Sequence, residues 1–231
     1  SIPDGVTKIW GYTFFKCENL EEVIIPDSVT SIEEEVFYGC ENLKKVVIPD
    51  GVTAIANGTF QQCSSLEEIV IPDGVTSIGN EAFEGCESLK EIIIPDGVTN
   101  IGESAFMWCN QATKIVLPAG ITEIPKWMLA YDIELLDVTI PENVTSIGKE
   151  AFVMCGNLTK IVVPKNVITI GEGAFSWCSG LTEITISNSV QSIEAEAFNK
   201  CSRLTDVYYD GTKEQWQAIS IDSTENEALL N

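Results

Sequence analysis

Apolar and polar positions along the chain recur at an interval of 23 residues. The phrase Ile-Pro-Asp-Gly-Val-Thr, or a close variant, appears nine times with no insertion or deletion between copies, beginning at Ile2, Ile25, Ile48, Ile71, Ile94, Leu117, Ile140, Val163 and Ile186. A fixed period of about 20 to 30 residues is typical of a solenoid, in which each coil buries its apolar face only against its neighbours. The period predicts one solenoid of nine coils over residues 1–208.

Each repeat contains a short strand with one buried face. In the second copy the spacing Leu-x-x-Val-x-Ile places Val46 inward and Val47 outward, the alternation of a strand. Pro49 in the next copy ends the strand because proline offers no N–H to a ladder, and Asp-Gly then turns the chain. We expect a second extended piece at Val29 and Ile32, and a short helical or 3-10 turn over residues 34–40.

The apolar columns of the repeat predict the core. One column is isoleucine in all nine copies and another, that of Phe37, is phenylalanine in eight, with Leu129 as the exception. Side chains of one column should stack on their own kind along a parallel β-sheet. At about 4.8 Å per coil the array should be roughly 40 Å long.

The fourth and fifth copies together show the fullest motif. It reads Cys-x-x-Leu-x-x-Ile-x-Ile-Pro-x-x-Val-x-x-Ile-x-x-x-Ala-Phe, as Cys86, Leu89, Ile92, Ile94, Pro95, Val98, Ile101, Ala105 and Phe106. The motif resembles the BspA-like, or Treponema pallidum class, leucine-rich repeat family over about residues 2–208. The resemblance implies a leucine-rich repeat solenoid with a parallel β-sheet, short extended segments and short turns. It also implies a secreted or cell-surface bacterial protein used in adhesion and host contact.

The net charge of −22 limits the partners of the chain. No basic patch exists for a phosphate backbone or an anionic membrane surface, so neither nucleic acid nor membrane insertion is expected. No apolar run approaches the roughly 20 residues of a membrane span, and we expect no signal peptide within this sequence. Because the sequence opens inside a repeat, at Ser1-Ile2-Pro3, we expect it to be part of a longer protein.

All eight cysteines fall in one column of the repeat: Cys17, Cys40, Cys63, Cys86, Cys109, Cys155, Cys178 and Cys201. An even count in an extracellular protein favours disulfides, but neighbours in register point the same way, which is poor geometry for a bridge. The alternative is a column of reduced, buried thiols. The chain has no histidine and no clustered ligands, so neither a zinc site nor a cofactor is expected.

The composition also argues against an enzyme. Without histidine the Ser-His-Asp and Cys-His mechanisms are excluded. Paired carboxylates are the general acid and base of glycoside hydrolysis, but 35 acids at repeat spacing produce close pairs by chance. We therefore expect a chain that does not catalyse a reaction.

Two surface columns have both a structural and a functional interpretation. The turn column contains five aspartates, which either bind their own turn amides or hold a cation such as calcium, namely Asp4, Asp27, Asp50, Asp73 and Asp96. The outward strand positions form two columns, one of mixed charges and one of mostly β-branched residues that includes Val47 and Val70. The β-branched residues either favour the strand conformation or contact a partner.

A third column departs most from the repeat. The position before the cysteine is small or polar in early copies, as in Gly39 and Gln62, and then becomes large and apolar in four consecutive coils: Trp108, Tyr131, Met154 and Trp177. An exposed apolar run marks a binding or self-association surface, whereas the alternative is that these side chains fold onto neighbouring coils. With Trp127 these four residues form the candidate binding patch.

The sixth coil lies inside this patch and breaks the consensus. Pro125-Lys126-Trp127-Met128-Leu129 replaces the usual Gly-x-x-Ala-Phe, and Asp132 takes the place of the cysteine. A carboxylate there must be hydrogen-bonded or turned outward, because burying it unpaired would be costly. Drift in a degenerate coil and a functional change both explain the departure.

The repeat ends after Tyr208, and residues 209–231 are expected to form a C-terminal cap. Thr212 and Gln215 have the spacing of a capping box at the start of a short helix, and Trp216 should cover the last coil. The tail also resembles the segment that closes arrays of this family. We expect no comparable N-terminal cap within this sequence, so the first coil should be uncovered and open to self-association.

These patterns predict a non-catalytic binding or adhesion module of a bacterial secreted or cell-surface protein. It would recognise a host protein or glycan through the candidate patch, and the same patch would also permit self-association. The alternative function is a stiff structural spacer that presents another domain.

Overall fold

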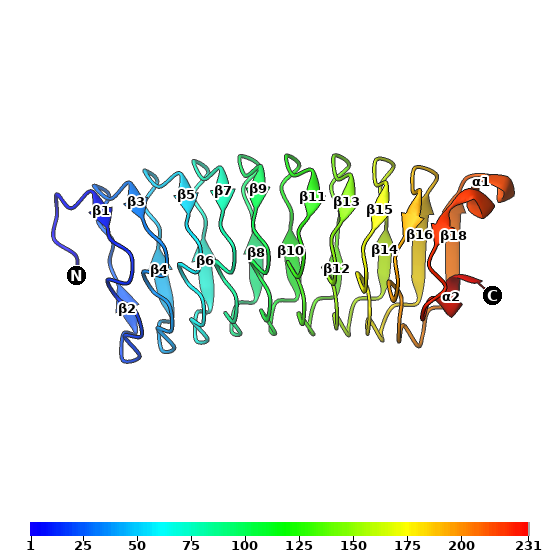
Figure 1. Cartoon of the computed structure of the whole chain (residues 1–231). Coiled ribbons are helices and arrows are strands. Elements are labelled where there is room, and N and C mark those ends of the chain that lie inside the picture. Colours follow the sequence, from blue (N-terminus) through cyan, green and yellow to red (C-terminus); the bar gives the residue numbers. More distant parts are fainter. Residues whose placement is uncertain (231) are drawn as a thin grey trace.

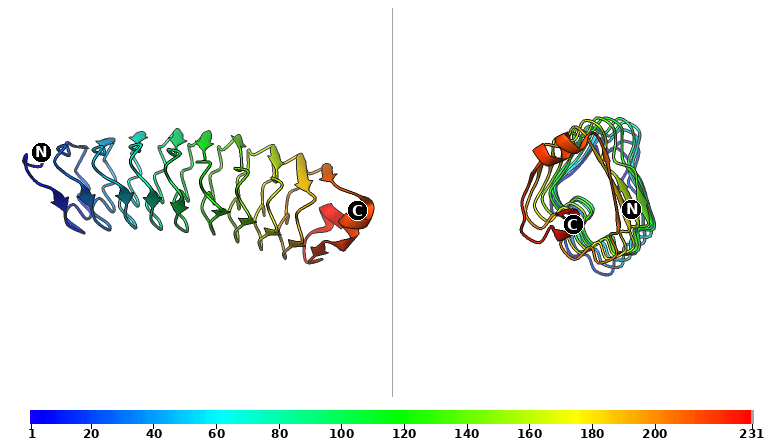
Figure 2. Two further views of the ribbon diagram at one scale, coloured as in Figure 1. Left: turned by 90° about the horizontal axis from the view of Figure 1, so that it is seen from above. Right: turned by 90° about the vertical axis from the view of Figure 1, so that its right-hand side faces the viewer.

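A computed structural model describes residues 1–230, and in it the repeats stack into one elongated solenoid (Figure 1). Each coil lies beside the copies before and after it, and the helices lie at the C-terminal end. Seen along the long axis, the coils nearly superimpose around a common interior (Figure 2). The predicted leucine-rich repeat solenoid is therefore confirmed.

One parallel face is formed by nine strands of two to five residues, which we call the longer strands as a set. They are β2 (Glu22–Val23), β4 (Lys45–Val47), β6 (Glu68–Val70), β8 (Glu91–Ile93), β10 (Lys114–Val116), β12 (Asp137–Val138), β14 (Lys160–Val162), β16 (Glu183–Ser187) and β18 (Asp206–Asp210). Paired residues are one repeat apart, as in Val46 with Ile69. Val46 is buried between exposed neighbours, as its alternation predicted.

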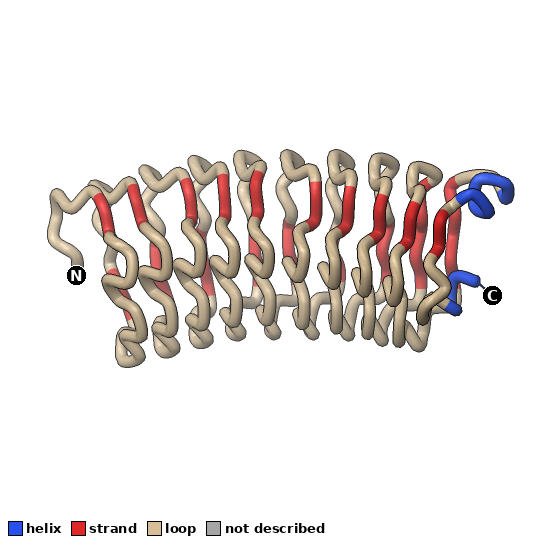
Figure 3. The backbone as a smooth tube through the Cα atoms, viewed as in Figure 1, coloured by secondary structure: helices blue, strands red, loops and turns tan. Residues whose placement is uncertain are grey.

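A second set of two-residue strands lies on another side of the coils (Figure 3). These are β1 (Lys8–Ile9), β3 (Ser31–Ile32), β5 (Ala54–Ile55), β7 (Ser77–Ile78), β9 (Asn100–Ile101), β11 (Glu123–Ile124), β13 (Ser146–Ile147), β15 (Thr169–Ile170), β17 (Ser192–Ile193) and β19 (Ser220–Ile221). β19 lies beyond the last repeat and still pairs with β17, so the C-terminal segment continues this ladder.

The segment expected as a helical or 3-10 turn forms two consecutive turns instead. Cys40 N–H donates to the Phe37 carbonyl oxygen at 3.1 Å, but Glu35 and Gly39 have φ of +52° and +67°. A left-handed residue interrupts a right-handed helical path. It also turns backbone N–H groups along the axis, so that Gly39 N–H donates to the Gln61 carbonyl oxygen of the next coil at 2.8 Å.

Stacked phenylalanines fill the centre of the coils. Successive rings are stacked, with centroids 5.1–5.4 Å apart and interplanar angles of 3–15°. The stack runs from Phe14 to Phe106 and again from Phe152 to Phe198, and Leu129 interrupts it in the sixth coil. Buried rings of this kind are a dominant stabilising contribution, because each removes a large apolar area from water.

Seven of the cysteines are buried, and Cys17 in the first coil is exposed. All eight are free thiols. Each buried Sγ donates to the backbone carbonyl oxygen of the residue at the phenylalanine position of the preceding coil, as from Cys86 to Phe60 at 3.2 Å. Burial raises the pKa of Cys40 to about 11 and that of Cys201 to about 12. The column is therefore a set of neutral thiols that pack as small apolar groups.

A short C-terminal segment follows the last coil. Helix α1 (Lys213–Ala218) begins with the predicted capping box, in which Gln215 N–H donates to Thr212 Oγ1 at 3.2 Å and Thr212 N–H donates to Gln215 Oε1 at 2.8 Å. The ring of Trp216 lies edge-on to Tyr209, with centroids 5.2 Å apart. Helix α2 (Glu227–Leu230) ends the described chain.

Candidate ligand-binding surface

The position before the cysteine has a left-handed backbone in every coil. Its φ lies between +53° and +71° from Lys16 to Lys200. This conformation lets the N–H group reach the next coil, as Trp108 N–H donates to the Ala130 carbonyl oxygen at 2.9 Å. Glycine adopts it freely, as Gly39 does, whereas other residues bear a cost of about 1 kcal/mol.

Four consecutive coils place large side chains at this costly position. We call Trp108, Tyr131, Met154 and Trp177 the aromatic row. Trp108, Met154 and Trp177 are 43%, 38% and 49% exposed, and Tyr131 is half-buried. The ring of Tyr131 lies 5.4 Å from that of Trp108, at an interplanar angle of 57°. Three members of the row therefore present much of their surface to solvent, and Tyr131 packs against one of them.

Trp127 does not belong to this row. It lies four residues before Tyr131, at another left-handed position, and it is half-buried. Its Nε1–H donates to Glu150 Oε2 at 3.0 Å, and Lys126 Nζ lies 3.8 Å from the ring centroid. The indole N–H and one ring face are thus already engaged within the chain, which leaves less of Trp127 for a ligand.

The positions that flank the cysteine column are uncharged along the aromatic row. Of the residues two before, one before and one after the cysteine position, none is charged in coils five to eight; they are Met107, Trp108, Asn110, Ala130, Tyr131, Ile133, Val153, Met154, Gly156, Ser176, Trp177 and Ser179. The same positions in earlier coils include Lys16, Glu18, Glu41, Glu84 and Glu87. A neutral surface in a chain of net charge −22 is suited to a ligand that does not require ion pairing.

Ile133 extends the row and was not among the predicted site residues. It is 48% exposed, and its Cγ2 lies 3.9 Å from the place that a Cβ on Gly156 would occupy. The signal was in the sequence, because earlier coils have Glu18, Glu41, Ser64, Glu87 and Asn110 at this position. An isoleucine in a polar column is informative only after the column is known to face solvent.

Asp132 follows Tyr131, a member of the aromatic row, in the sequence. Its side chain is fully buried, and Oδ1 accepts a hydrogen bond from Cys109 N–H at 2.8 Å. Within residues 1–230, Oδ2 has no hydrogen-bond partner. Burial raises the pKa of this carboxyl group well above its usual range, and the Cys109 hydrogen bond only partly opposes the shift.

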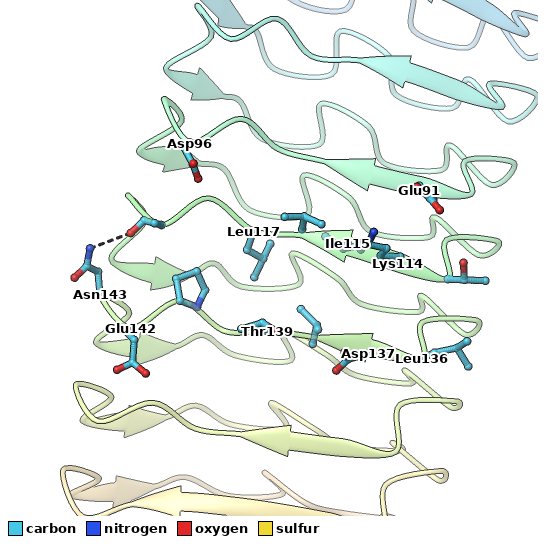
Figure 4. A pocket seen from close by; sticks show the side chains of 15 residues that line it. Glu91, Asp96, Lys114, Ile115, Leu117, Leu136, Asp137, Thr139, Glu142 and Asn143 are labelled. Atoms are coloured by element: carbon cyan, nitrogen blue, oxygen red, sulfur yellow. Dashed lines mark hydrogen bonds between the residues drawn. The ribbon is translucent and has the colours of Figure 1, made fainter.

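The outer face of the longer strands is a second candidate surface. Ile24 and Val70 are 72% and 70% exposed, in a β-branched column that continues toward β18. A groove of about 750 Å³ lies over β10 and β12, with Leu117, Leu136 and Thr139 among its lining residues (Figure 4). Both explanations of this column, strand preference and partner contact, are compatible with its exposure.

One pair of opposite charges forms across this face. Lys160 Nζ lies 2.5 Å from Glu183 Oε1 on the neighbouring strand. In the part of the chain that the structure describes, no group of three or more histidine, cysteine, aspartate or glutamate side chains is placed to hold a metal ion. Over the same residues, no helix has the length and apolar character that crossing a membrane requires.

Comparisons with known proteins agree with the architecture. The family model for the BspA type leucine rich repeat region matches residues 1–113 and 99–226, in six copies. No curated protein matches the sequence.

Solved leucine-rich repeat structures are similar to the chain. A protein from Bacteroides ovatus is 31% identical, with a TM-score of 0.76 over 88% of this chain and 59% of that one. A leucine rich cell surface protein from Faecalibacterium prausnitzii is 31% identical (TM-score 0.53; 96% of this chain, 74% of that one), and the T. pallidum leucine rich repeat protein is 27% identical (TM-score 0.56; 80% and 78%). The chain thus spans 59% of the length of the Bacteroides protein. With its 23-residue period, parallel strands and matched repeats, the chain belongs to the BspA-type leucine-rich repeat family.

Proposed function

We propose that the chain is a non-catalytic binding module of a bacterial cell-surface or secreted protein, and that it recognises a host protein or glycan through the aromatic row. The observation that carries this proposal is the exposure of Trp108, Met154 and Trp177 at left-handed positions where glycine is the least costly residue. Residues that add backbone strain and apolar exposure together contribute little to folding. Contact with a ligand would explain why such residues occupy these positions.

The chemistry of the row supports binding of either class of ligand. Exposed indole rings present flat apolar faces with a polar N–H at the edge, and they are enriched among the residues that dominate binding energies. The cell-surface description of the Faecalibacterium protein supports an extracellular location for this chain as well. Ile133 widens the apolar area, whereas we assign Trp127 mainly to the packing of coil six.

A binding screen tests the proposal. Host extracellular proteins and glycans are arrayed against the wild type, the double variant Trp108→Ser/Trp177→Ser, and a control, Ile24→Ser/Val70→Ser, on the outer strand face. We expect ligands that bind the wild type and the control but not the aromatic-row variant. Loss of binding in the strand-face variant alone would assign recognition to that face and contradict the proposal. Sedimentation of the wild type alone separates self-association from ligand binding.

The alternative of a structural spacer predicts a different result. A spacer needs only the stiff stack of coils, so no ligand would be retained by the wild type. Replacement of the array by unrelated coils of equal length would then leave attachment of the parent protein to cells and matrix unchanged.

A further inference from the structure

A buried thiol and a backbone amide share one acceptor in most coils of this fold. Eight coils carry a cysteine, and in all of them except the fifth the cysteine N–H donates to the phenylalanine carbonyl oxygen three residues earlier. Where the next coil also carries a cysteine, its Sγ donates to the same atom. The Phe60 carbonyl oxygen, for example, accepts from Cys63 N–H at 3.1 Å and from Cys86 Sγ at 3.2 Å.

The junction of coils five and six breaks this pattern at two points. Cys109 N–H turns away from the Phe106 carbonyl oxygen and donates to Asp132 Oδ1 at 2.8 Å. Asp132 also replaces the cysteine whose Sγ would have reached Phe106. Among the hydrogen bonds of residues 1–230, none is donated to the Phe106 carbonyl oxygen. A buried acceptor without a donor is destabilising, because folding removes its hydrogen bond to water and supplies none in return.

A proton on Asp132 Oδ2 would make this atom a hydrogen-bond donor for the Phe106 carbonyl oxygen. Asp132 Oδ2 is fully buried and has no partner within the described residues. The Asp132 side chain occupies the column position that holds a cysteine in the other coils. In those coils the cysteine Sγ donates to the carbonyl oxygen equivalent to that of Phe106, at distances of 3.1–3.6 Å. A proton on Oδ2 converts an acceptor into a donor, so that Asp132 and Phe106 are both satisfied.

The groups that face Asp132 do not supply a compensating positive charge. The two thiols of its column, Cys109 and Cys155, lie in the flanking coils, and burial raises the pKa of both so that they stay neutral. No lysine or arginine forms an ion pair with Asp132 in the described part of the chain. An ionised Asp132 would therefore be a buried, unpaired charge.

The junction is directly connected to the aromatic row. Asp132 follows Tyr131 in the sequence, and the amide that it holds, Cys109 N–H, follows Trp108. The rings of Trp108 and Tyr131 are in contact, and each belongs to the residue that precedes one partner of this hydrogen bond. A change in the charge of Asp132 thus acts on the backbone that positions the only aromatic pair of the row.

We propose that Asp132 is a neutral carboxylic acid in the folded chain, that its Oδ2–H donates to the Phe106 carbonyl oxygen, and that rising pH weakens the junction carrying Trp108 and Tyr131. The regulatory consequence, a surface that is better ordered in acidic surroundings, rests on the proposed function. The protonation and the hydrogen bond do not.

Urea unfolding at a series of pH values tests the protonation. Asp132→Asn imitates the neutral acid, because its Nδ2–H can donate to Phe106 while Oδ1 accepts from Cys109, and it does not titrate. The folded state of the wild type holds a proton that the unfolded state releases above pH about 4, so stability falls as pH rises. Between pH 5 and the folded pKa, the unfolding equilibrium constant of the wild type should rise about tenfold per pH unit relative to Asp132→Asn.

A matched control and a second variant keep the result decisive. Asp137→Asn removes an exposed carboxylate of the same coil and should keep the pH dependence of the wild type. If Asp132→Asn does not fold, Asp132→Cys restores the column residue and should give the same reference below about pH 8, where the thiol of the unfolded chain stays protonated. If the ratio of the unfolding equilibrium constants of wild type and Asp132→Asn stays constant from pH 5 to pH 9, the proposal is overturned.

Infrared spectroscopy observes the proton directly. The wild type at pH 7 should show the carbonyl stretch of a protonated carboxyl group, and the band should be missing from Asp132→Asn. Absence of the protonated-carboxyl band from the wild type at pH 7 would refute the assignment. Hydrogen exchange over residues 106–112 should quicken with pH more in the wild type than in Asp132→Asn; equal acceleration would remove the link to the aromatic row. None of these measurements uses a ligand, so a failed binding screen leaves their outcome intact.

Discussion

The reactivity of the cysteines is the most direct chemical consequence of the repeat. When the folded protein is treated with a thiol reagent such as dithionitrobenzoate at pH 8, we predict that one thiol per chain reacts rapidly, namely that of Cys17. This is the one exposed cysteine, whereas the other seven are buried and donate their S–H to a carbonyl oxygen. The thiolate is the reactive form, so both burial and a raised pKa suppress the reaction.

The size of the effect follows from the pKa shifts. A thiol with a pKa of about 9 is roughly 10% ionised at pH 8. Burial raises the pKa of Cys40 to about 11, which lowers its thiolate fraction about a hundredfold, and that of Cys201 to about 12, which lowers it about a thousandfold. Restricted access of the reagent slows these thiols further, so two well-separated phases are expected.

The assay is the absorbance of the released thiolate. Folded wild type should release one equivalent rapidly, denatured wild type eight, and folded Cys17→Ser none in the rapid phase. Two or more rapid equivalents from folded wild type would refute the buried column. Fewer than eight from denatured, unreduced protein would show that disulfides form despite the geometry of the column.

Three further substitutions test the packing. Phe83→Ala removes a ring stacked on both sides and should lower the free energy of unfolding, measured in urea, by about 3–5 kcal/mol; a loss below 1 kcal/mol would contradict the continuous stack. Trp127→Phe removes the hydrogen bond to Glu150 and should cost about 1 kcal/mol in the same assay while leaving ligand binding intact; weakened binding would return Trp127 to the contact surface. Thr212→Ala breaks the capping box with Gln215 and should cost about 1 kcal/mol by thermal unfolding; no change in Tm would show that α1 does not support the last coil.

The period made most of the fold predictable from sequence. A 23-residue interval without insertions determines which residues pair, so the register of Val46 with Ile69 follows once strands are placed. The Phe and Cys columns were recognised as core because identical side chains recur at identical places. The capping box at Thr212 was visible because its spacing is local.

Features that depend on backbone handedness were not predictable in the same way. The turns of residues 34–40 contain left-handed residues such as Glu35, which no local pattern distinguishes from a helical turn. The glycines of these columns were a weak hint, because Gly58 and Gly173 share a column with Glu35, and Gly39 and Gly85 share one with Lys16 and Gln62. The pairing of β19 with β17 lies outside the repeat, so the period carries no information about it.

The candidate site was predictable in position but not in detail. The sequence identified the aromatic row as a departure from the repeat, and the structure adds that Trp108, Met154 and Trp177 face solvent. That Trp127 is held by Glu150 depends on a contact between coils that column comparison does not reveal. The same holds for the orientation of the Asp132 carboxyl group toward Cys109.

The most direct test of the account is the dissociation constant of a ligand from the screen, measured for wild type, Trp108→Ser/Trp177→Ser and Ile24→Ser/Val70→Ser. If each indole contributes about 1–2 kcal/mol to binding, the aromatic-row variant should bind on the order of a hundredfold more weakly, while the strand-face variant stays within about threefold of wild type. Equal affinity of the wild type and the aromatic-row variant, with both correctly folded, would contradict the claim that this chain binds through the aromatic row.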